Sequence, residues 1–115
     1  MTLTIEHHYG PHSFQIIELS PTEINATAKV YYGGFSGVIK VSTDQYLDFL
    51  LDFDPSILPT RVGSDFFDGE HYYVKIDGQE VCHSTHGVLP EFEKLWTKLL
   101  SVVKQEYTLR RKLEL

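Results

Sequence analysis

Cysteine is almost absent from this chain. Cys82 is the only one among 115 residues, so no disulfide can form within the chain. A single cysteine is typical of proteins from reducing compartments, and we therefore expect a cytoplasmic location. The sequence also has no run of about 18 apolar residues, which predicts no membrane span. The N-terminus lacks the basic start and long apolar stretch of a signal peptide.

Other absences concern domain organisation. The sequence has no internal repeat, no low-complexity tract and no linker rich in proline, glycine or serine. Its hydrophobic content of 42% and aromatic content of 13% are those of a folded globular protein. A chain of 115 residues is long enough for one hydrophobic core. We therefore expect a single domain over residues 1–115.

The first half of the sequence has the alternating pattern of β-strands. Residues 2–9 and 12–19 predict two strands, with a turn at Gly10-Pro11 between them. Residues 23–41 predict a hairpin in which Gly33-Gly34 forms the two-residue turn. Outward from that turn, one face carries the apolar side chains and the other most of the polar ones. The apolar face is expected to hold Ile24, Ala26, Ala28, Val30, Tyr32, Phe35, Gly37, Ile39 and Val41.

The second half mixes helical and strand patterns. A short helix is predicted from Ser42 or Thr43 to about Asp52. Its expected buried stripe consists of Tyr46, Leu47, Leu50 and Leu51. Residues 53–70 predict a packed loop with a short edge strand near 60–63, and a second hairpin is centred on Asp77-Gly78. A helix of about 24 residues starts at Pro90, a residue suited to the first helical position.

These elements predict an α+β fold. We expect a mainly antiparallel sheet of five or six strands, with a short central helix and a long C-terminal helix packed on one face. The helices fall within and after the strand set, so a doubly wound parallel fold is not expected.

Charge is distributed unevenly along the sequence. The net charge is −6, and seven acids lie between Asp44 and Glu70, where Arg61 is the single base. This segment therefore carries the whole net charge of the chain. A local acidic field attracts basic partners and repels nucleic acid, so direct nucleic-acid binding is not expected. The alternative is that the acidic segment forms an ordinary solvated surface, which keeps the protein soluble.

The acidic segment suggests a docking face for a basic protein partner. The function we expect is a non-catalytic interaction module, such as an inhibitor or immunity-type protein against a nucleic-acid-processing enzyme or toxin. Asp44, Asp48 and Asp52 stand four residues apart and line one face of the predicted helix. The candidate partner-binding residues, which include two apolar anchors, are Asp44, Asp48, Asp52, Asp54, Asp65, Phe66, Phe67 and Asp68.

Histidine and cysteine supply the competing hypothesis. With a two-residue turn at Asp77-Gly78, His71, Cys82 and His86 share one face of the second hairpin. Imidazole and thiolate suit zinc, so this face could serve a small metal-binding sensor or an enzyme. The spacing matches no strong zinc signature and offers no coherent catalytic set. We therefore expect no enzyme activity, no resident metal and no cofactor.

The end of the long helix supplies a further alternative. A helix of about 24 residues is about 36 Å long and exceeds strands of about 20 Å, so part of it should overhang the sheet. Exposed apolar residues on that overhang would favour a second copy of the chain. The predicted dimer contacts of such a homodimeric structural subunit are Tyr107, Leu109 and Leu113.

Overall fold

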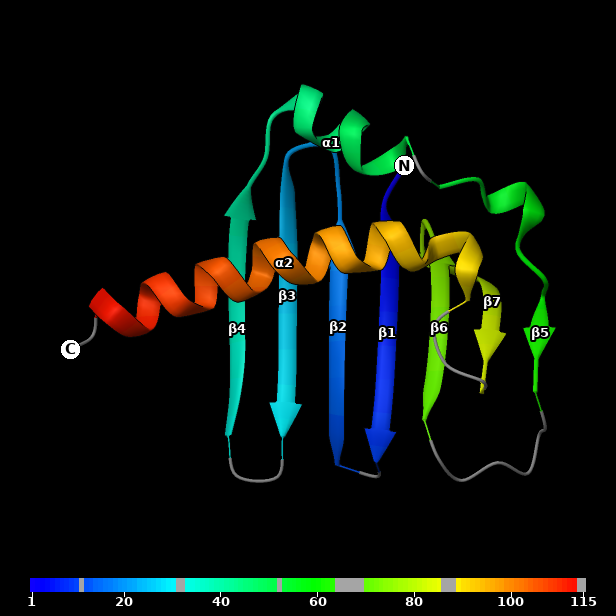
Figure 1. The fold of residues 1–115 in the computed structure, drawn as a ribbon, viewed down its shortest axis with the longest axis horizontal. Helices are drawn as coiled ribbons and strands as arrows, with labels where there is room; N and C mark the ends of the chain where they lie inside the picture. The colour runs from blue at the N-terminus through cyan, green and yellow to red at the C-terminus, as the bar shows by residue number, and fades with distance from the viewer. Residues whose placement is uncertain (11, 31–32, 52, 64–69, 86–88, 114–115) are drawn as a thin grey trace.

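The computed structural model describes residues 1–10, 12–30, 33–51, 53–63, 70–85 and 89–113, with side chains in the last helix described as far as residue 109. These residues form an α+β fold built on one sheet of seven strands in the order β4-β3-β2-β1-β6-β7-β5 (Figure 1). The strands are β1 (Leu3–Gly10), β2 (Ser13–Leu19), β3 (Glu23–Val30), β4 (Gly33–Lys40), β5 (Arg61–Val62), β6 (His71–Ile76) and β7 (Gln79–Ser84). The strand count is therefore higher than the five or six that the sequence predicted.

The additional strand is the short edge strand expected near residues 60–63. β5 has only two residues and pairs parallel to β7, whereas the other strand pairs are antiparallel. The backbone of Thr60 and Val62 also accepts hydrogen bonds from the N–H groups of His83 and Thr85, at 3.0 and 2.9 Å. The prediction of a mainly antiparallel sheet is confirmed.

In the part of the chain that the structure describes, three helical segments accompany the sheet: α1 (Thr43–Leu50), the 3-10 turn η1 (Pro55–Ile57) and α2 (Pro90–Leu113). The α2 helix lies across one face of the sheet, and its C-terminal end extends past the edge strand β4 (Figure 1). The core forms where this helix meets the strands. Its fully buried apolar side chains include Leu3, Ile5, Ile17, Leu19, Ile24, Phe92, Leu95 and Leu99. No helix among the described residues is long and apolar enough to cross a membrane.

The β3–β4 hairpin has the predicted faces but not the predicted turn. Val30 pairs with Gly33 and Ala28 with Phe35, so Gly33-Gly34 does not form the turn. Residues 31–32, between the two strands, lie outside the described residues. Gly33 and Gly34 instead belong to β4. A Cβ atom on Gly34 would lie 2.8 Å from the backbone oxygen of Ala28, so glycine permits a close approach of the strands here. The register error spans an even number of residues and therefore leaves the face division intact.

The β6–β7 hairpin has the predicted turn but different faces. Asp77 and Gly78 both have positive φ, 50° and 85°, as a type I′ turn requires. Lys75 pairs with Glu80 as expected, but Val74 pairs with Cys82. Val81 is therefore an extra residue in β7 with no partner residue opposite it in β6. This β-bulge turns Cys82 onto the core face. The predicted grouping of Cys82 with His71 on one face is therefore wrong.

Capping fixes the start of α1. The Ser42 hydroxyl accepts a hydrogen bond from Gln45 N, and the Gln45 side chain accepts one from Ser42 N, at 3.2 and 2.8 Å. This reciprocal pair is a capping box. The Tyr46 hydroxyl donates to the carbonyl of Met1 at 2.6 Å, which ties the helix to the start of β1. The predicted start of the helix at Ser42–Thr43 is confirmed.

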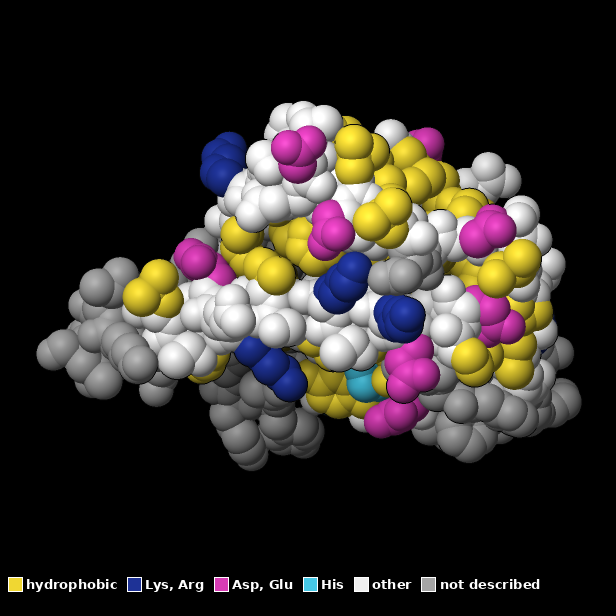
Figure 2. All heavy atoms as spheres, turned by 45° about the horizontal axis from the view of Figure 1, so that its top comes forward, with side chains coloured by type: hydrophobic (Ala, Val, Ile, Leu, Met, Phe, Trp, Pro, Cys, Tyr) yellow, Lys and Arg dark blue, Asp and Glu magenta, His cyan; other side chains and the backbone are white. Residues whose placement is uncertain are grey.

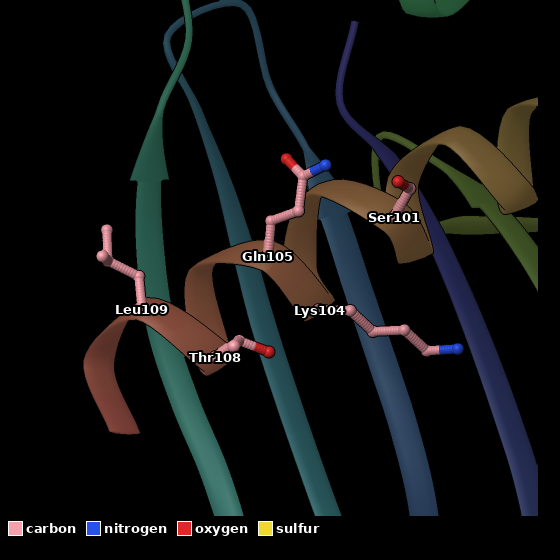
Figure 3. Close-up of a pocket in the computed structure, with 5 residues that line it drawn as sticks. All are labelled: Ser101, Lys104, Gln105, Thr108 and Leu109. Atoms are coloured by element: carbon pink, nitrogen blue, oxygen red, sulfur yellow. The ribbon is translucent and has the colours of Figure 1, made fainter. Parts of the chain in front are cut away.

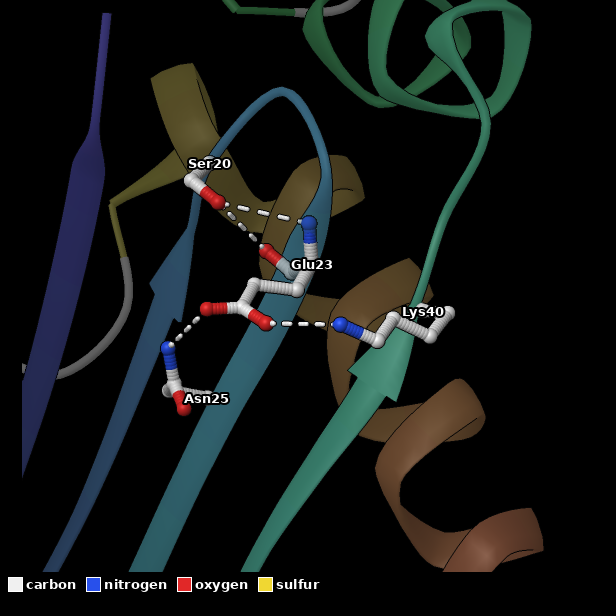
Figure 4. Close-up of polar contacts among 4 residues, drawn as sticks. All are labelled: Ser20, Glu23, Asn25 and Lys40. Atoms are coloured by element: carbon white, nitrogen blue, oxygen red, sulfur yellow. Dashed lines mark hydrogen bonds and ion pairs between the residues drawn. The ribbon is translucent and has the colours of Figure 1, made fainter.

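Polar contacts fix the turn between β2 and β3, at the same end of the sheet. The Ser20 hydroxyl bonds both the carbonyl oxygen and the N–H of Glu23, at 3.0 and 3.3 Å. The Glu23 carboxylate then reaches Asn25 on its own strand and Lys40 on β4, at 3.4 and 3.5 Å (Figure 4). These contacts join three successive strands next to the start of α1.

Candidate functional site

The outward face of α1 combines acidic and apolar side chains. Tyr46 and Phe49 are buried against the sheet, whereas Leu47 and Leu51 are 54% and 78% exposed. The predicted buried stripe was therefore wrong for these two leucines, because the helix turns Phe49 inward in their place. Asp44 and Asp48 are also exposed. Successive residues of an α-helix are rotated by about 100°, which places these two aspartates within one arc of about 100° together with Leu47 and Leu51. We call these four residues the α1 surface.

The α1 surface continues into the next segment. Ile57 in η1 is 59% exposed, and Asp54 at the start of η1 is also exposed. Figure 2 shows acidic side chains beside hydrophobic ones over α1 and the chain that follows it. Large apolar side chains grouped on a surface and bordered by charge are typical of protein-binding sites.

Two of the predicted acids have local partners. Asp48 lies 3.8 Å from the Lys98 ammonium group on α2, which also donates to the Asp48 carbonyl at 3.5 Å. Asp54 accepts hydrogen bonds from the side chain and the backbone N–H of Ser56, at 2.6 and 3.0 Å. These two bonds, the side-chain bond first, lower the pKa of Asp54 below its usual value. Asp54 therefore caps η1 as well as carrying charge.

A groove of about 670 Å³ runs between α1 and α2 beside the α1 surface. Phe49 and Val102 supply its apolar lining, and Asp44 and Asp48 supply its acidic side. Lys98 lies along the same groove and offsets part of this acidity. The groove could therefore take an apolar or basic side chain from a partner.

The rest of the predicted acidic face lies outside the described residues. This group consists of Asp52, Asp65, Phe66, Phe67 and Asp68. The structure thus describes Asp44, Asp48 and Asp54 of the predicted set. It adds Leu47 and Leu51, which the helical pattern predicted to be buried, and Ile57, which was expected in a packed loop. Including Phe49 in the predicted buried stripe of the helix would have rotated that stripe and placed Leu47 and Leu51 on the exposed side.

The opposite face of the sheet carries a second cluster. His8 on β1 stands opposite His71 on β6, and His83 on β7 stands opposite Tyr73. The rings of Tyr73 and His83 are stacked with centroids 4.4 Å apart, and His8 meets the edge of Tyr73 at 5.5 Å. His71 Nδ1 lies 2.8 Å from His83 Nε2. We call His8, His71, Tyr73 and His83 the histidine cluster.

Carboxylates border the histidine cluster. Glu6 pairs with Lys75, and it also lies 2.9 Å from His8 Nε2. Burial alone would raise the pKa of Glu6, but the hydrogen bonds from Lys75 and His8 outweigh it and hold the pKa below its usual value. Hydrogen bonding to Glu6 likewise raises the pKa of Lys75. This pair keeps its charges over a wide pH range.

The predicted set of His71, Cys82 and His86 does not converge as expected. Cys82 is 1% exposed in the core, and burial, followed by the charges of Glu91 and Glu80, raises the pKa of its thiol. A neutral, buried thiol is a poor nucleophile and metal ligand. His86 lies outside the described residues. His83 joins His71 instead, because the bulge at Val81 exchanges the two faces of β7.

His7 occupies the core side of the sheet. Its ring stacks on Tyr72 with centroids 4.2 Å apart, and its Nε2 lies 3.7 Å from the Glu70 carboxylate. Burial lowers the pKa of His7, and the charge of Glu70 opposes that shift only in part. The adjacent Tyr72 has a raised pKa, chiefly through burial and then through Glu70. His7 is thus held mainly in its neutral form.

The C-terminal half of α2 exposes the predicted dimer residues. Tyr107 and Leu109 are 43% and 53% exposed, and Tyr107 meets the Phe35 ring edge-to-face at 5.3 Å. Leu113 lies in the helix, but its side chain is outside the description. Figure 3 shows Leu109 with the polar side chains of Ser101, Lys104, Gln105 and Thr108 along this part of α2.

Among the described residues, no three or more histidine, cysteine, aspartate and glutamate side chains come together to hold a metal ion. Comparison of the chain with protein families, with curated proteins and with solved structures finds no match.

Proposed function

We propose that this chain is a non-catalytic protein-binding module that recognises a basic partner through its α1 surface. The observation that carries the proposal is the 54% and 78% exposure of Leu47 and Leu51 beside Asp44 and Asp48. Exposing large apolar side chains is unfavourable in water, by about 25 cal/mol per Å². A partner that covers them would recover this free energy.

The composition of the α1 surface suggests the chemistry of its partner. Apolar anchors at the centre of an interface supply affinity, and surrounding charges supply orientation and association rate. The charges of the chain sum to −6, and Asp44, Asp48 and Asp54 border the exposed apolar residues. The partner would thus present an apolar patch surrounded by lysine and arginine.

Basic surfaces of that kind are common on proteins that bind nucleic acid. A small acidic protein that covers such a surface would prevent nucleic-acid binding. We therefore propose an inhibitor or immunity-type role against a nucleic-acid-processing enzyme or toxin, in the cytoplasm. The support for this role is the charge and apolar pattern of the α1 surface.

The proposal is tested by capture of partners from a lysate of the source organism. Wild type would be compared with Asp44→Lys/Asp48→Lys at low and moderate salt. The matched control, Glu80→Lys/Glu93→Lys, changes net charge equally at exposed acids outside the α1 surface. We expect a protein retained by wild type and the control but lost from the α1 variant. Equal retention by both variants would contradict a recognition role for the α1 surface.

A second candidate is a homodimeric structural subunit. It is favoured by the end of α2, which extends past β4 with Tyr107 and Leu109 exposed (Figure 1). A second copy could cover these side chains while leaving the α1 surface accessible. The two roles are therefore compatible with each other. The oligomeric state in solution tests the homodimer without testing the protein-binding role of the α1 surface.

A further inference from the structure

Two histidines of the histidine cluster bring ring nitrogens from adjacent strands together. His71 Nδ1 and His83 Nε2 are 2.8 Å apart, and their rings are inclined by 22° with centroids 5.1 Å apart. Neutral imidazole is the commonest metal ligand and suits copper, nickel and zinc. We propose that His71 and His83 bind one late first-row divalent cation, Cu²⁺ or Ni²⁺, with water in the remaining positions.

The order of cation affinities indicates which cation the two imidazoles prefer. The 2.8 Å between His71 Nδ1 and His83 Nε2 is the length of the hydrogen bond between the rings, and the rings turn before a cation binds, so this distance does not select a cation. Imidazole suits zinc, copper and nickel, and a given site binds Cu²⁺ most tightly among the first-row divalent ions. We therefore expect Cu²⁺ to bind more tightly than Ni²⁺ or Zn²⁺.

Cation binding replaces the hydrogen bond between the two rings. In that bond one nitrogen carries the proton and the other accepts it, so only one lone pair is engaged. When the neutral rings carry their protons on His71 Nε2 and His83 Nδ1, both facing lone pairs become available. Each ring then turns toward a common point, and the cation loses two water molecules. Protonation of either ring opposes binding, so affinity falls at acid pH.

The sheet holds the two ligands in place before the cation arrives. Both residues lie on paired strands, and the His83 ring stacks on Tyr73 within 8° of parallel. The His71 ring lies at 14° to the same tyrosine ring, with centroids 6.2 Å apart. Ligands positioned by rigid elements and stacking lose little conformational entropy on binding.

The charge around the histidines favours a cation. A hollow of about 350 Å³ beside His71 is lined by Glu6, Glu80 and Lys75 together with His8 and Tyr73. Two carboxylates and one ammonium group leave this hollow net negative. Both ligand residues are half-buried rather than enclosed in the core, and His71 lines the hollow. The site lies on the sheet face opposite α2 and is independent of the protein-binding proposal.

The test is a calorimetric titration of untagged protein with NiCl₂ at pH 7.5. His71→Phe and His83→Phe each remove a ligand while keeping an aromatic ring beside Tyr73. His12→Ala is the control, because His12 is an exposed histidine outside the cluster. We expect one Ni²⁺ per chain in wild type and in the control, and at least tenfold weaker binding in either phenylalanine variant. Wild type should bind Cu²⁺ more tightly than Ni²⁺ or Zn²⁺.

Paramagnetic broadening by Cu²⁺ locates the site independently. In ¹⁵N-correlated NMR spectra, amide signals next to His71 and His83 should disappear first as CuCl₂ is added. Undiminished Ni²⁺ binding in His83→Phe, or broadening centred elsewhere, would overturn the proposal. His83→Gln repeats the titration if the phenylalanine variant fails to fold.

Discussion

Most acidic side chains that the structure describes near a functional surface also have a local structural partner. Asp48 lies near Lys98, Asp54 caps η1 through Ser56, and Glu6 pairs with Lys75. An exposed ion pair such as Asp48–Lys98 adds about 0–1 kcal/mol, so this contact is secondary for stability. Charge alone therefore does not define a site here. The exposed Leu47 and Leu51 distinguish the α1 surface from an ordinary solvated one.

At His7, burial should couple folding to pH. Its folded-state pKa is lowered by burial, whereas an unfolded histidine titrates near about 6.5. As pH falls below that value the unfolded chain takes up the proton first, so the free energy of unfolding decreases. This contribution is complete above about pH 6.5 and is lost as pH falls through the folded-state pKa. His7→Phe should retain the ring contact with Tyr72 and weaken this dependence.

Urea unfolding at pH 7.5 and 5.0 measures that effect. Wild type should lose more stability than His7→Phe between the two pH values. Other titrating groups are common to both proteins, so the difference isolates His7. An identical loss in the two proteins would show that His7 does not contribute to the pH dependence.

At Gly34, the absence of a side chain should be required by strand packing. A Cβ there would lie 2.8 Å from Ala28 O, while a Cβ on Gly10 would meet nothing closer than 3.9 Å. Gly34→Ala should therefore destabilise the protein by about 1–3 kcal/mol, and Gly10→Ala by less than about 0.5 kcal/mol. Chemical denaturation compares the two. Similar losses would contradict the assignment of Gly34 to a close contact.

At the scale of elements, the sequence predicted where helices and strands lie along the chain better than which of their faces are buried. The capping signal at Ser42 and the proline at residue 90 both mark helix starts that the structure has. The alternating pattern predicted the faces of β3 and β4 correctly even though the turn was placed wrongly. The register error spans an even number of residues, and such a shift keeps each side chain on the same face. The alternating pattern of apolar and polar residues does not indicate the β-bulge at Val81. One extra residue reversed the face of Cys82 and brought His83 to His71.

The faces of α1 were harder to predict for a physical reason. A short helix with many apolar residues can be rotated in several ways, and only the shape of the adjoining core selects one. Here Tyr46 and Phe49 fill the space at the end of the strands, which leaves Leu47 outside. The sequence therefore identified Asp44 and Asp48 as surface residues but not the leucines beside them.

At the scale of the whole molecule, three surfaces formed by the described residues are candidates for binding. The α1 surface lies at one end of the strands, the histidine cluster on the sheet face opposite α2, and the end of α2 beyond β4 (Figure 1). Each has a different chemistry: the first is acidic with apolar anchors, the second is rich in imidazole, and the third has the exposed Tyr107 and Leu109 among polar side chains. Their separation allows partner binding, cation binding and self-association to be tested one at a time.

Self-association through the end of α2 is tested by light scattering over a range of protein concentrations. If a second copy covers Tyr107 and Leu109, the mass should approach twice 13.2 kDa as concentration rises. Leu109→Ser should shift the equilibrium toward monomer, because a serine buries less apolar area. Leu47→Ser is the matched control and should leave the mass unchanged. A strict monomer at high concentration would contradict this role.

The central claim is that the exposed leucines of α1 anchor a basic protein partner. The most direct measurement compares capture by wild type and Leu47→Ser/Leu51→Ser from the same lysate, with urea unfolding of both proteins as the control. Because both leucines are already exposed, each substitution should change stability by less than about 0.5 kcal/mol. We predict that the partner retained by wild type is lost from the variant. Full retention by a stably folded variant would contradict the claim.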